Sequence, residues 1–493
     1  MALNVIKLVQ GATEIDLNDG SNSALVDFQP QPPDLQTTLA RAPFGHGAEL
    51  AFARRDLAQH TVRWQQKASS HDNLVTKITD IERLLEAAME NQEYRNRNWS
   101  YTPVYFQYKP ADATVLAQTE VLYGGWQPPT DAFGVPLRSK YFRGSQLSLA
   151  CRPFLDATAL STLVAATTIN NGLGNAISFA GRLGSVAAPS RITLDTFSGG
   201  SDDRVVVGLR RLGTPANFVA GHELESATLG GNLYWAVNLI TSVDESGFSP
   251  GSGNVGIEIL PTGAEGYTTY TNFVVATITL SSNIADQLGA FKVFVRCKGL
   301  NNRVIGLLVR PFVQYGALAK QYGPYTTVYP VYPAALNEIE MLDLTPTSPI
   351  RVASLHSAGI APAKVGYEIV AQAGSTASTP KLRCDYMQLI PVGEGNGGTG
   401  ALDTTLPVAF TATGMVSVRL DTRDLNPPVG LFDGTPTLAY GYSKKAGRGI
   451  FLPPNGKLFF MLTTGANAVH DYTRTFKAKL EYAARYLSLM GTT

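Results

Sequence analysis

Charged residues are scarce in this chain, and neither sign dominates. Of the 493 residues only 16% are charged, and 40 Lys and Arg stand against 39 Asp and Glu, which leaves a net charge of +1. A protein that binds nucleic acid usually carries a basic patch or stripe. The balance therefore argues against nucleic acid as a partner. A surface with few charges also suits burial within a large assembly.

Long apolar runs are also missing. The chain holds no stretch of about 18 apolar residues, which a membrane-spanning helix would need. The N-terminal sequence MALNVIKLVQ lacks the long apolar core and the small-residue cleavage site of a signal peptide. We therefore expect no membrane span, and synthesis in a cytoplasm.

Cysteine is rare. Cys151, Cys297 and Cys384 lie far apart in the sequence, each in or at the end of a strand-like run. Small buried thiols in a protein made in a reducing cytoplasm are the ordinary interpretation. One long-range disulfide is the alternative, and the sequence does not say which pair, if any, would form it.

Motifs of catalysis and of metal or phosphate binding are absent from the sequence. There is no G-x-S-x-G, P-loop, H-E-x-x-H or paired C-x-x-C. The dipeptide His222-Glu223 has no second histidine four residues on, and the other histidines are scattered. The glycine-rich stretches at 171–175, 199–200 and 395–400 open no helix that could hold an anion. We predict no catalytic, cofactor-binding or metal-binding residues, no cofactor and no enzyme activity.

Asp421, Asp424 and Asp433 form the densest acidic cluster. Their spacing does not fit a calcium loop, which needs alternating ligands around a central glycine. Solvated carboxylates in turns are the simpler interpretation, because charged side chains are rarely buried. Glycoside hydrolysis needs two carboxylates across a cleft. A polysaccharide depolymerase therefore remains a minor alternative.

What the chain does have is the composition of a mainly β protein with short strands. Hydrophobic residues make up 44%, and the 47 glycines and 29 prolines supply many turns. One helix is expected, at 72–91, with Asp72 as its N-cap. Apolar residues recur there at steps of three and four and would form one buried face: Leu74, Ile78, Ile81, Leu85 and Ala88.

Turn signals and composition divide the chain into four segments. Residues 1–155 should form a β-barrel that the helix covers, and 156–215 a connecting β segment. The six strand-like runs after about 267 favour a jelly-roll β-sandwich over 216–393. The linker-like sequence EGNGGTG begins a C-terminal β-domain at 394–493.

Tyrosines gather in the stretch 315–334, among glycine and proline. They are Tyr315, Tyr322, Tyr325, Tyr329 and Tyr332. A tyrosine offers apolar area together with a hydroxyl, so this stretch could be a surface for a glycan or a partner, together with Trp235. The alternative is that the rings simply cover one face of the sandwich.

Three features in this order resemble the distal tail protein and minor tail protein family of long-tailed, siphovirus-like bacteriophages. The first is the unit with the DLNDG turn at 16–20, the strand ending after Trp64, the helix and the PVYFQY strand at 103–108. The second is KLRCDYMQLIPVGEG at 381–395, similar to the last strand of a galectin-like or carbohydrate-binding-like jelly roll. The third is the ending YAARYLSLMG. The chain departs from the family in continuing through 394–493.

The resemblance implies a structural protein of the virion tail tip. It implies a homo-oligomeric ring, a hexamer by family analogy, which joins the tail tube to the tail-tip or baseplate hub. The tail tube protein and tail hub or tape-measure-associated proteins would be its partners, with the barrel of 1–155 facing the tube. The charged helix face, with Lys77, Glu82 and Glu86, would meet the neighbouring subunit. A glycan-binding or receptor-binding tail protein that recognises host-surface carbohydrate is the alternative.

Overall fold

The fold comes from a computed structural model of the full chain. It describes residues 3–41, 48–97, 101–127, 141–170, 176–198, 204–211, 221–224, 228–229, 236–244, 255–262, 271–279, 290–299, 305–326, 329–331, 340–345, 350–351, 364–373, 382–391, 401–405, 417–423, 429–432, 443–446, 450–463 and 474–487. These residues form a mainly β protein with one helix and several antiparallel sheets, as the sequence predicts.

The chain forms two compact units, and each combines segments that are distant in sequence. The first unit is Met1–Ser161 with Leu183–Ala188 and Tyr482–Thr493. The second unit is Thr162–Arg182 with Pro189–Glu481. The last residues of the chain therefore complete the unit that the first residues begin.

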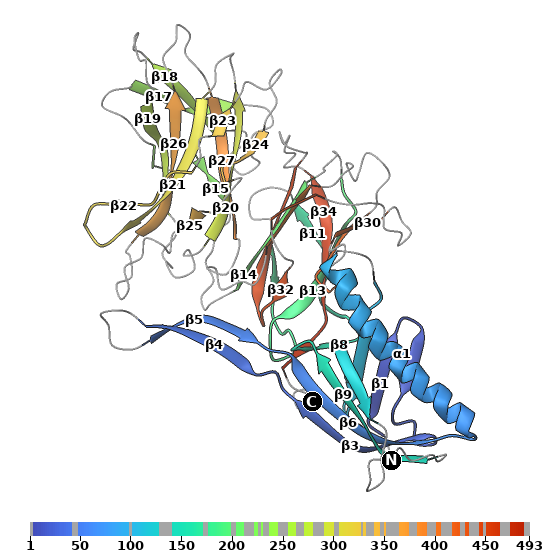
Figure 1. The fold of residues 1–493 in the computed structure, drawn as a ribbon. Coiled ribbons are helices and arrows are strands. Elements are labelled where there is room, and N and C mark those ends of the chain that lie inside the picture. The colour runs from blue at the N-terminus through green and yellow to red at the C-terminus, as the bar shows by residue number, and fades with distance from the viewer. Residues whose placement is uncertain are drawn as a thin grey trace. The chain divides into compact units, whose positions relative to one another are not determined.

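An antiparallel sheet of nine strands forms the body of the first unit (Figure 1). Its order is β2-β1-β7-β8-β9-β6-β3, with β10 and β35 attached beside β8. The strands are β1 (Val5–Gln10), β2 (Thr13–Asp16), β3 (Ser23–Gln31), β6 (Ala58–Lys67), β7 (Val104–Lys109), β8 (Ala117–Gln127), β9 (Tyr141–Cys151), β10 (Leu155–Ala157) and β35 (Arg485–Tyr486). In the described residues β2 and β3 end the path without pairing to each other, so the sheet is open and the expected closed barrel is not found.

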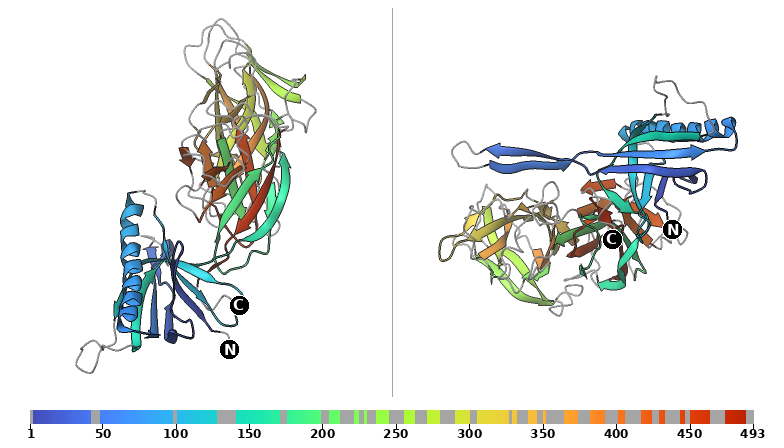
Figure 2. Two further views of the ribbon diagram at one scale, coloured as in Figure 1. Left: turned by 90° about the vertical axis from the view of Figure 1, so that its right-hand side faces the viewer. Right: turned by 90° about the horizontal axis from the view of Figure 1, so that it is seen from below.

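The helix α1 (His71–Asn96) lies along one face of this sheet, against β1, β7 and β8 (Figure 2). It begins one residue before the expected start, because Ser70 rather than Asp72 is the N-cap. The Ser70 side chain accepts a hydrogen bond from the backbone N–H of Asn73 at 3.2 Å. The helix also runs five residues past the expected end at 91.

The buried face of α1 closes the core of the first unit. Ile81 and Leu85 belong to one apolar cluster with Trp64 and Phe106 of the sheet. Along strand β6 buried residues alternate with exposed or partly buried ones, which places Val62 and Trp64 on the core side. The helix is therefore held by its own subunit through its apolar residues.

Two strands leave the sheet as an arm. β4 (Leu35–Arg41) and β5 (Ala48–Arg55) pair with each other and with no other strand in the described part of the chain. Figure 1 shows this two-stranded ribbon extending away from the nine-stranded sheet.

Two sheets of the second unit are built from strands of both 161–211 and 401–482. One has the order β11-β34-β13-β29-β30 with β32 on β13, and the other β12-β33-β14-β28-β31. Phe460 and Phe476 make a ring contact between them, with centroids 6.0 Å apart. The strands are β11 (Ser161–Asn170), β12 (Ala176–Phe179), β13 (Ala188–Asp195), β14 (Arg204–Arg211), β28 (Ala401–Thr405), β29 (Ser417–Asp421), β30 (Val429–Phe432), β31 (Ser443–Ala446), β32 (Phe451–Leu452), β33 (Gly456–Thr463) and β34 (Thr475–Tyr482).

A second pair of sheets is inserted between β14 and β28. The orders are β17-β18-β27-β20-β24, with β15 and β25 attached, and β16-β19-β26-β21-β22, with β23 attached. The strands are β15 (Gly221–Glu223), β16 (Thr228–Leu229), β17 (Ala236–Asp244), β18 (Val255–Thr262), β19 (Thr271–Thr279), β20 (Ala290–Gly299), β21 (Ile305–Gln314), β22 (Gln321–Tyr322), β23 (Tyr329–Val331), β24 (Glu340–Asp343), β25 (Ile350–Arg351), β26 (Lys364–Ala373) and β27 (Leu382–Pro391). Residues of both sheets share one apolar core. The segments 156–215 and 394–493, expected to be separate, thus contribute to the same sheets around this inserted sandwich.

The inserted sandwich joins the other pair of sheets through a buried contact. Gly208 of β14 lies so close to the end of β27 that a Cβ there would stand 2.5 Å from the carbonyl oxygen of Pro391. Asp343 of β24 binds Arg204 of β14 at 2.8 Å and Lys292 of β20 at 2.9 Å, and all three are buried. Burial alone would raise the pKa of Asp343, but the two cations hold it below its usual value.

Candidate functional site

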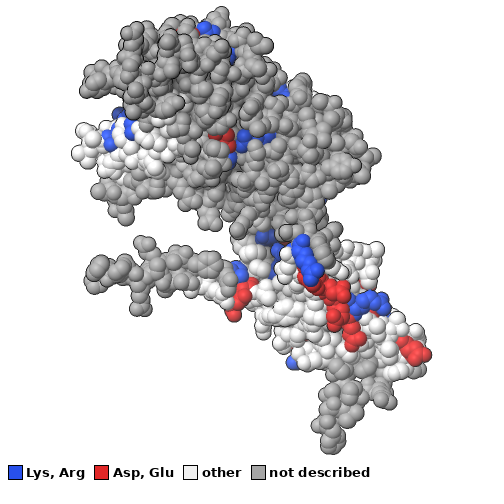
Figure 3. Space-filling model, turned by 45° about the horizontal axis from the view of Figure 1, so that its top comes forward, with Lys and Arg blue, Asp and Glu red and all other residues white. Residues whose placement is uncertain are grey.

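The outward face of α1 carries a line of glutamates. Glu82 and Glu86 are exposed, whereas Lys77 is half-buried. Two more exposed glutamates, Glu90 and Glu93, continue the line at steps of four and three residues, which places all four on one side of the helix. Figure 3 shows Asp and Glu gathered along this helix with a few Lys and Arg beside them. This acidic line, Glu82 to Glu93, is available to a molecule outside the subunit.

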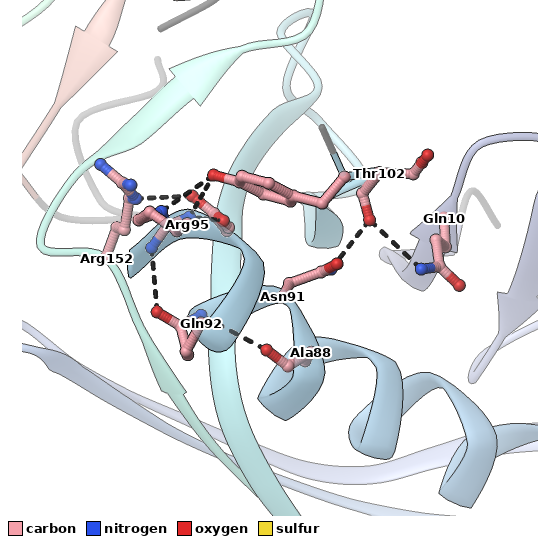
Figure 4. A network of polar contacts seen from close by, with 9 residues as sticks. Gln10, Ala88, Asn91, Gln92, Arg95, Thr102 and Arg152 are labelled. Carbon is pink, nitrogen blue, oxygen red and sulfur yellow. Dashed lines mark hydrogen bonds and ion pairs between the residues drawn. The ribbon is translucent and has the colours of Figure 1, made fainter. Parts of the chain in front are cut away.

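A network of polar contacts fixes the end of α1 on the sheet (Figure 4). Glu120 of β8, which is 8% exposed, pairs with Arg95 of the helix and with Arg152. The Asn91 side chain donates to the carbonyl oxygen of Thr102 at 2.8 Å. These polar anchors explain why the helix continues past 91, where its apolar pattern stops. They also keep the acidic line in a fixed position relative to the sheet.

The arm and the sheet edges are the second candidate surface. Strands β2 and β3 each pair with one strand among the described residues, so each leaves one edge without a strand partner there. In β4 of the arm, the Gln36 side chain donates to Asp56 at 2.7 Å, and Leu35 is 52% exposed. On β3, Val26 is 57% exposed. Exposed apolar residues on unpaired strand edges are typical of surfaces that pair with another chain.

The third candidate surface is the loop that follows β21, which the sequence singled out for its tyrosines. Tyr315 is partly buried and packs against the core of the inserted sandwich. Tyr322 and Tyr325 are each 41% exposed, and Leu318 is 66% exposed. The side chain of Tyr329 lies outside the described residues, and so do Tyr332 and Trp235 as a whole.

An arginine braces the two exposed tyrosines. The Arg310 guanidinium carbon lies 3.7 Å from the centre of the Tyr322 ring and 4.9 Å from that of Tyr325. Glu368, which is 2% exposed, holds Arg310 with two hydrogen bonds of 2.9 and 2.7 Å. The same carboxylate accepts from Lys320 at 2.8 Å and from the Tyr322 hydroxyl at 3.0 Å. The rings are therefore held in place before any ligand arrives.

The charges around Glu368 set its ionisation. Burial alone would raise its pKa, but Lys320 and Arg310 keep the pKa below the usual value, so the carboxylate is ionised at neutral pH. Burial and the hydrogen bond to Glu368 raise the pKa of Tyr322. Sequence reasoning found the tyrosines but missed Arg310 and Glu368, because they lie on separate strands that pair only in the fold.

Asp421, from the acidic cluster of the sequence, is a buried ion-pair partner rather than a solvated turn residue. It binds Arg191 at 2.7 Å and Arg423 at 3.2 Å. These cations outweigh the effect of burial and hold the pKa of Asp421 below its usual value. Asp424 and Asp433 lie outside the described residues.

The described residues hold neither a metal site nor a membrane-spanning helix. No group of three or more His, Cys, Asp or Glu there is arranged to hold a metal ion. The described helix is not apolar enough over a sufficient length to cross a membrane.

Comparison with known proteins finds similarity only among solved structures, since no family model and no curated protein matches. The SPP1 Dit (gp 19.1) protein, described as a paradigm of the hub adsorption apparatus of phages that infect Gram-positive bacteria, matches at 10% identity. The match covers 44% of this chain and 72% of that one, with a TM-score of 0.27.

Two structures of the phage p2 baseplate in its activated conformation also match. The calcium form has 10% identity over 78% of this chain and 98% of the other, and the strontium form has 11% identity over 76% and 99%. Both TM-scores are 0.20. The matched structures are thus a phage hub protein and two states of a phage baseplate.

Proposed function

We propose that this chain is a structural virion protein of a phage tail tip, and that it forms a ring which joins the tail tube to the tail-tip or baseplate hub. By analogy with the family that the sequence resembles, the ring is a hexamer. Its other partners are the tail tube protein and the tail hub or tape-measure-associated proteins. The chain is made in the host cytoplasm and ends up in the virion.

The observation that carries this proposal is the arm formed by β4 and β5. These strands have no strand partner but each other in the described part of the chain. An isolated two-stranded ribbon is marginally stable in water, and its outer edges are templates for another strand. The arm therefore gains its stability from contact with a neighbouring molecule. Most homo-oligomers have closed symmetry. In a closed ring of identical subunits, every arm contacts a neighbouring subunit.

The acidic line on α1 supports the same proposal. Glu82 and Glu86 are exposed on a helix whose apolar face is already buried in its own subunit. Like charges four residues apart weaken an isolated helix slightly. In a ring they would meet cations of the adjacent subunit. We expect Lys77, which is half-buried, to contribute less to that interface than the two glutamates.

Light scattering on two purified proteins, the intact chain and a variant that lacks the arm, tests this function. In the test variant residues 36–54 are replaced by a short Gly-Ser turn, which keeps Leu35 and Arg55 at the ends. The intact chain should have the mass of a ring, and the shortened chain the mass of a monomer. Lys364→Ala, an exposed change far from the arm in sequence, is the control and should keep the ring. Equal masses for the intact and shortened chains would count against the arm as the assembly element.

A second candidate function is recognition of a host-surface glycan by the inserted sandwich. The braced rings of Tyr322 and Tyr325 favour it, because the apolar face of a sugar stacks on an aromatic ring that already has its bound orientation. A glycan array would test it. This function is supported if the intact chain binds a glycan and the substitutions Tyr322→Ala and Tyr325→Ala each abolish that binding. An intact chain with no signal above background would remove it.

A further inference from the structure

Two of the three cysteines face each other across neighbouring strands of the inserted sandwich. Cys297 of β20 is directly opposite Cys384 of the antiparallel strand β27. Both side chains are fully buried and belong to the same apolar core. Both are thiols in the structure. The fold thus places two cysteines that are 87 positions apart in sequence opposite each other on neighbouring strands.

The register brings these residues to disulfide distance. Directly opposed residues of an antiparallel pair have Cα atoms about 4.5 or 5.5 Å apart, and a disulfide spans Cα separations of about 4.4–6.8 Å. Opposed side chains also project from the same face of the sheet, so both sulfur atoms lie on the core side. The register shifts between Val295 and Cys297, and such an irregularity lets the strand adjust locally.

We propose that Cys297 and Cys384 form a reversible disulfide when the protein meets an oxidising medium that contains small-molecule disulfides. One protein thiolate attacks a sulfur of the small disulfide and displaces one small thiolate. The second protein thiolate then attacks the mixed disulfide and displaces the other. Two protein thiols and one small disulfide become one protein disulfide and two small thiols. The two protons of the protein thiols pass to the released thiolates.

The bridge is expected to form slowly and to be easily reduced. Both sulfur atoms are buried, so exchange requires β20 and β27 to open locally. Cross-strand Cβ atoms are about 4.5–5.5 Å apart, whereas disulfide Cβ atoms average about 3.8 Å. Closing that gap strains the bond, and strained disulfides are the more reducible ones.

Cys151 provides an internal control. It lies in the first unit on β9, where its strand neighbours are Ala58 and Val121 and no cysteine is opposite. Burial, with a smaller contribution from Glu120, raises the pKa of its thiol. A thiol reacts through its thiolate. Because no cysteine lies opposite Cys151 to complete a bridge, it should stay reduced under conditions that oxidise the other pair.

Peptide mapping of the wild-type full chain is the direct test. The protein is incubated with oxidised glutathione, blocked with N-ethylmaleimide under denaturing conditions and digested without reductant. We expect a cross-linked peptide pair that contains Cys297 and Cys384, with Cys151 alkylated. Three alkylated cysteines, glutathione adducts alone, or a bridge to Cys151 would each overturn the proposal. Mild denaturant should speed the reaction, because it increases local opening.

Thermal unfolding of the oxidised protein gives a second readout. Because the bridge closes a long loop, oxidation should raise the Tm of the inserted sandwich by roughly 5 °C, and dithiothreitol should reverse the shift. Cys384→Ser should lose both the cross-link and the shift, whereas Cys151→Ser should keep both. If oxidation shifts the Tm of Cys384→Ser as much as that of the wild type, the proposed pair is not the cause. None of these outcomes depends on whether the protein forms a ring.

Discussion

At the scale of single residues, His60 is the clearest case of a property, its burial in the uncharged form, that the sequence does not reveal. Its side chain is 3% exposed, and among the described residues neither ring nitrogen has a hydrogen-bond partner. Its ring lies 5.5 Å from that of Phe106 and 6.1 Å from that of Phe28, measured between centroids. Burial lowers its pKa from 6.5 to about 4. The sequence supports the view that an isolated histidine is no ligand, but it cannot show that this one is buried uncharged.

His60 should make the first unit sensitive to mild acid. Between about pH 6.5 and pH 4 the unfolded chain binds a proton that the folded chain does not, so stability falls as the pH falls. The loss should reach about 3 kcal/mol near pH 4. Chemical denaturation at a series of pH values measures it. In His60→Leu this part of the pH dependence should disappear, and an unchanged slope in that variant would mean that another group is responsible.

At the scale of elements, the helix was largely predictable and the sheets were not. Residues such as Ile81 and Leu85 recur with the helical period, and this local signal survives in the fold as the buried face of α1. The polar end of the helix escaped prediction because Asn91 and Arg95 are held by Thr102 and Glu120, partners outside the helix. Strand order has no local signal of that kind, so the open path of the sheet could not be read from the sequence.

The two faces of α1 should respond differently to substitution. Ile81 is 1% exposed in the apolar core, so Ile81→Asp buries an unpaired charge and should prevent the first unit from folding. The adjacent Glu82→Lys changes an exposed side chain and should leave the Tm nearly unchanged while it weakens assembly. Circular dichroism and light scattering separate the two effects. Folded Ile81→Asp protein would show that this face is not the buried one.

At the scale of the whole molecule, the end of the chain contacts the first unit, and no local sequence pattern predicts this contact. Arg485 holds Asp156 through hydrogen bonds of 2.5 and 2.8 Å, across 329 positions of sequence. Strand β35 pairs with β10 of the first unit, and the backbone N–H of Ala157 donates to Ala484. The sequence did indicate strands within 381–395 and within YAARYLSLMG, where the structure has β27 and β35. Which strands they would join depends on contacts that only the complete fold creates.

The first unit should therefore need the end of the chain. Arg485→Ala removes charge-assisted hydrogen bonds to Asp156 and should destabilise the unit by about 1.5–3 kcal/mol. Hydrogen exchange of the β10 amides should rise together with the loss of stability. Lys477→Ala, an exposed change on β34, is the matched control and should alter neither. Equal exchange in both variants would mean that β35 does not support β10.

Negative-stain microscopy of the intact chain at high concentration tests the ring most directly. If β4 and β5 find their partners in neighbouring subunits, the particles should be closed rings of identical subunits with one axis of symmetry, six-fold by family analogy. Particles that remain single chains at the highest concentration reached would contradict the proposal.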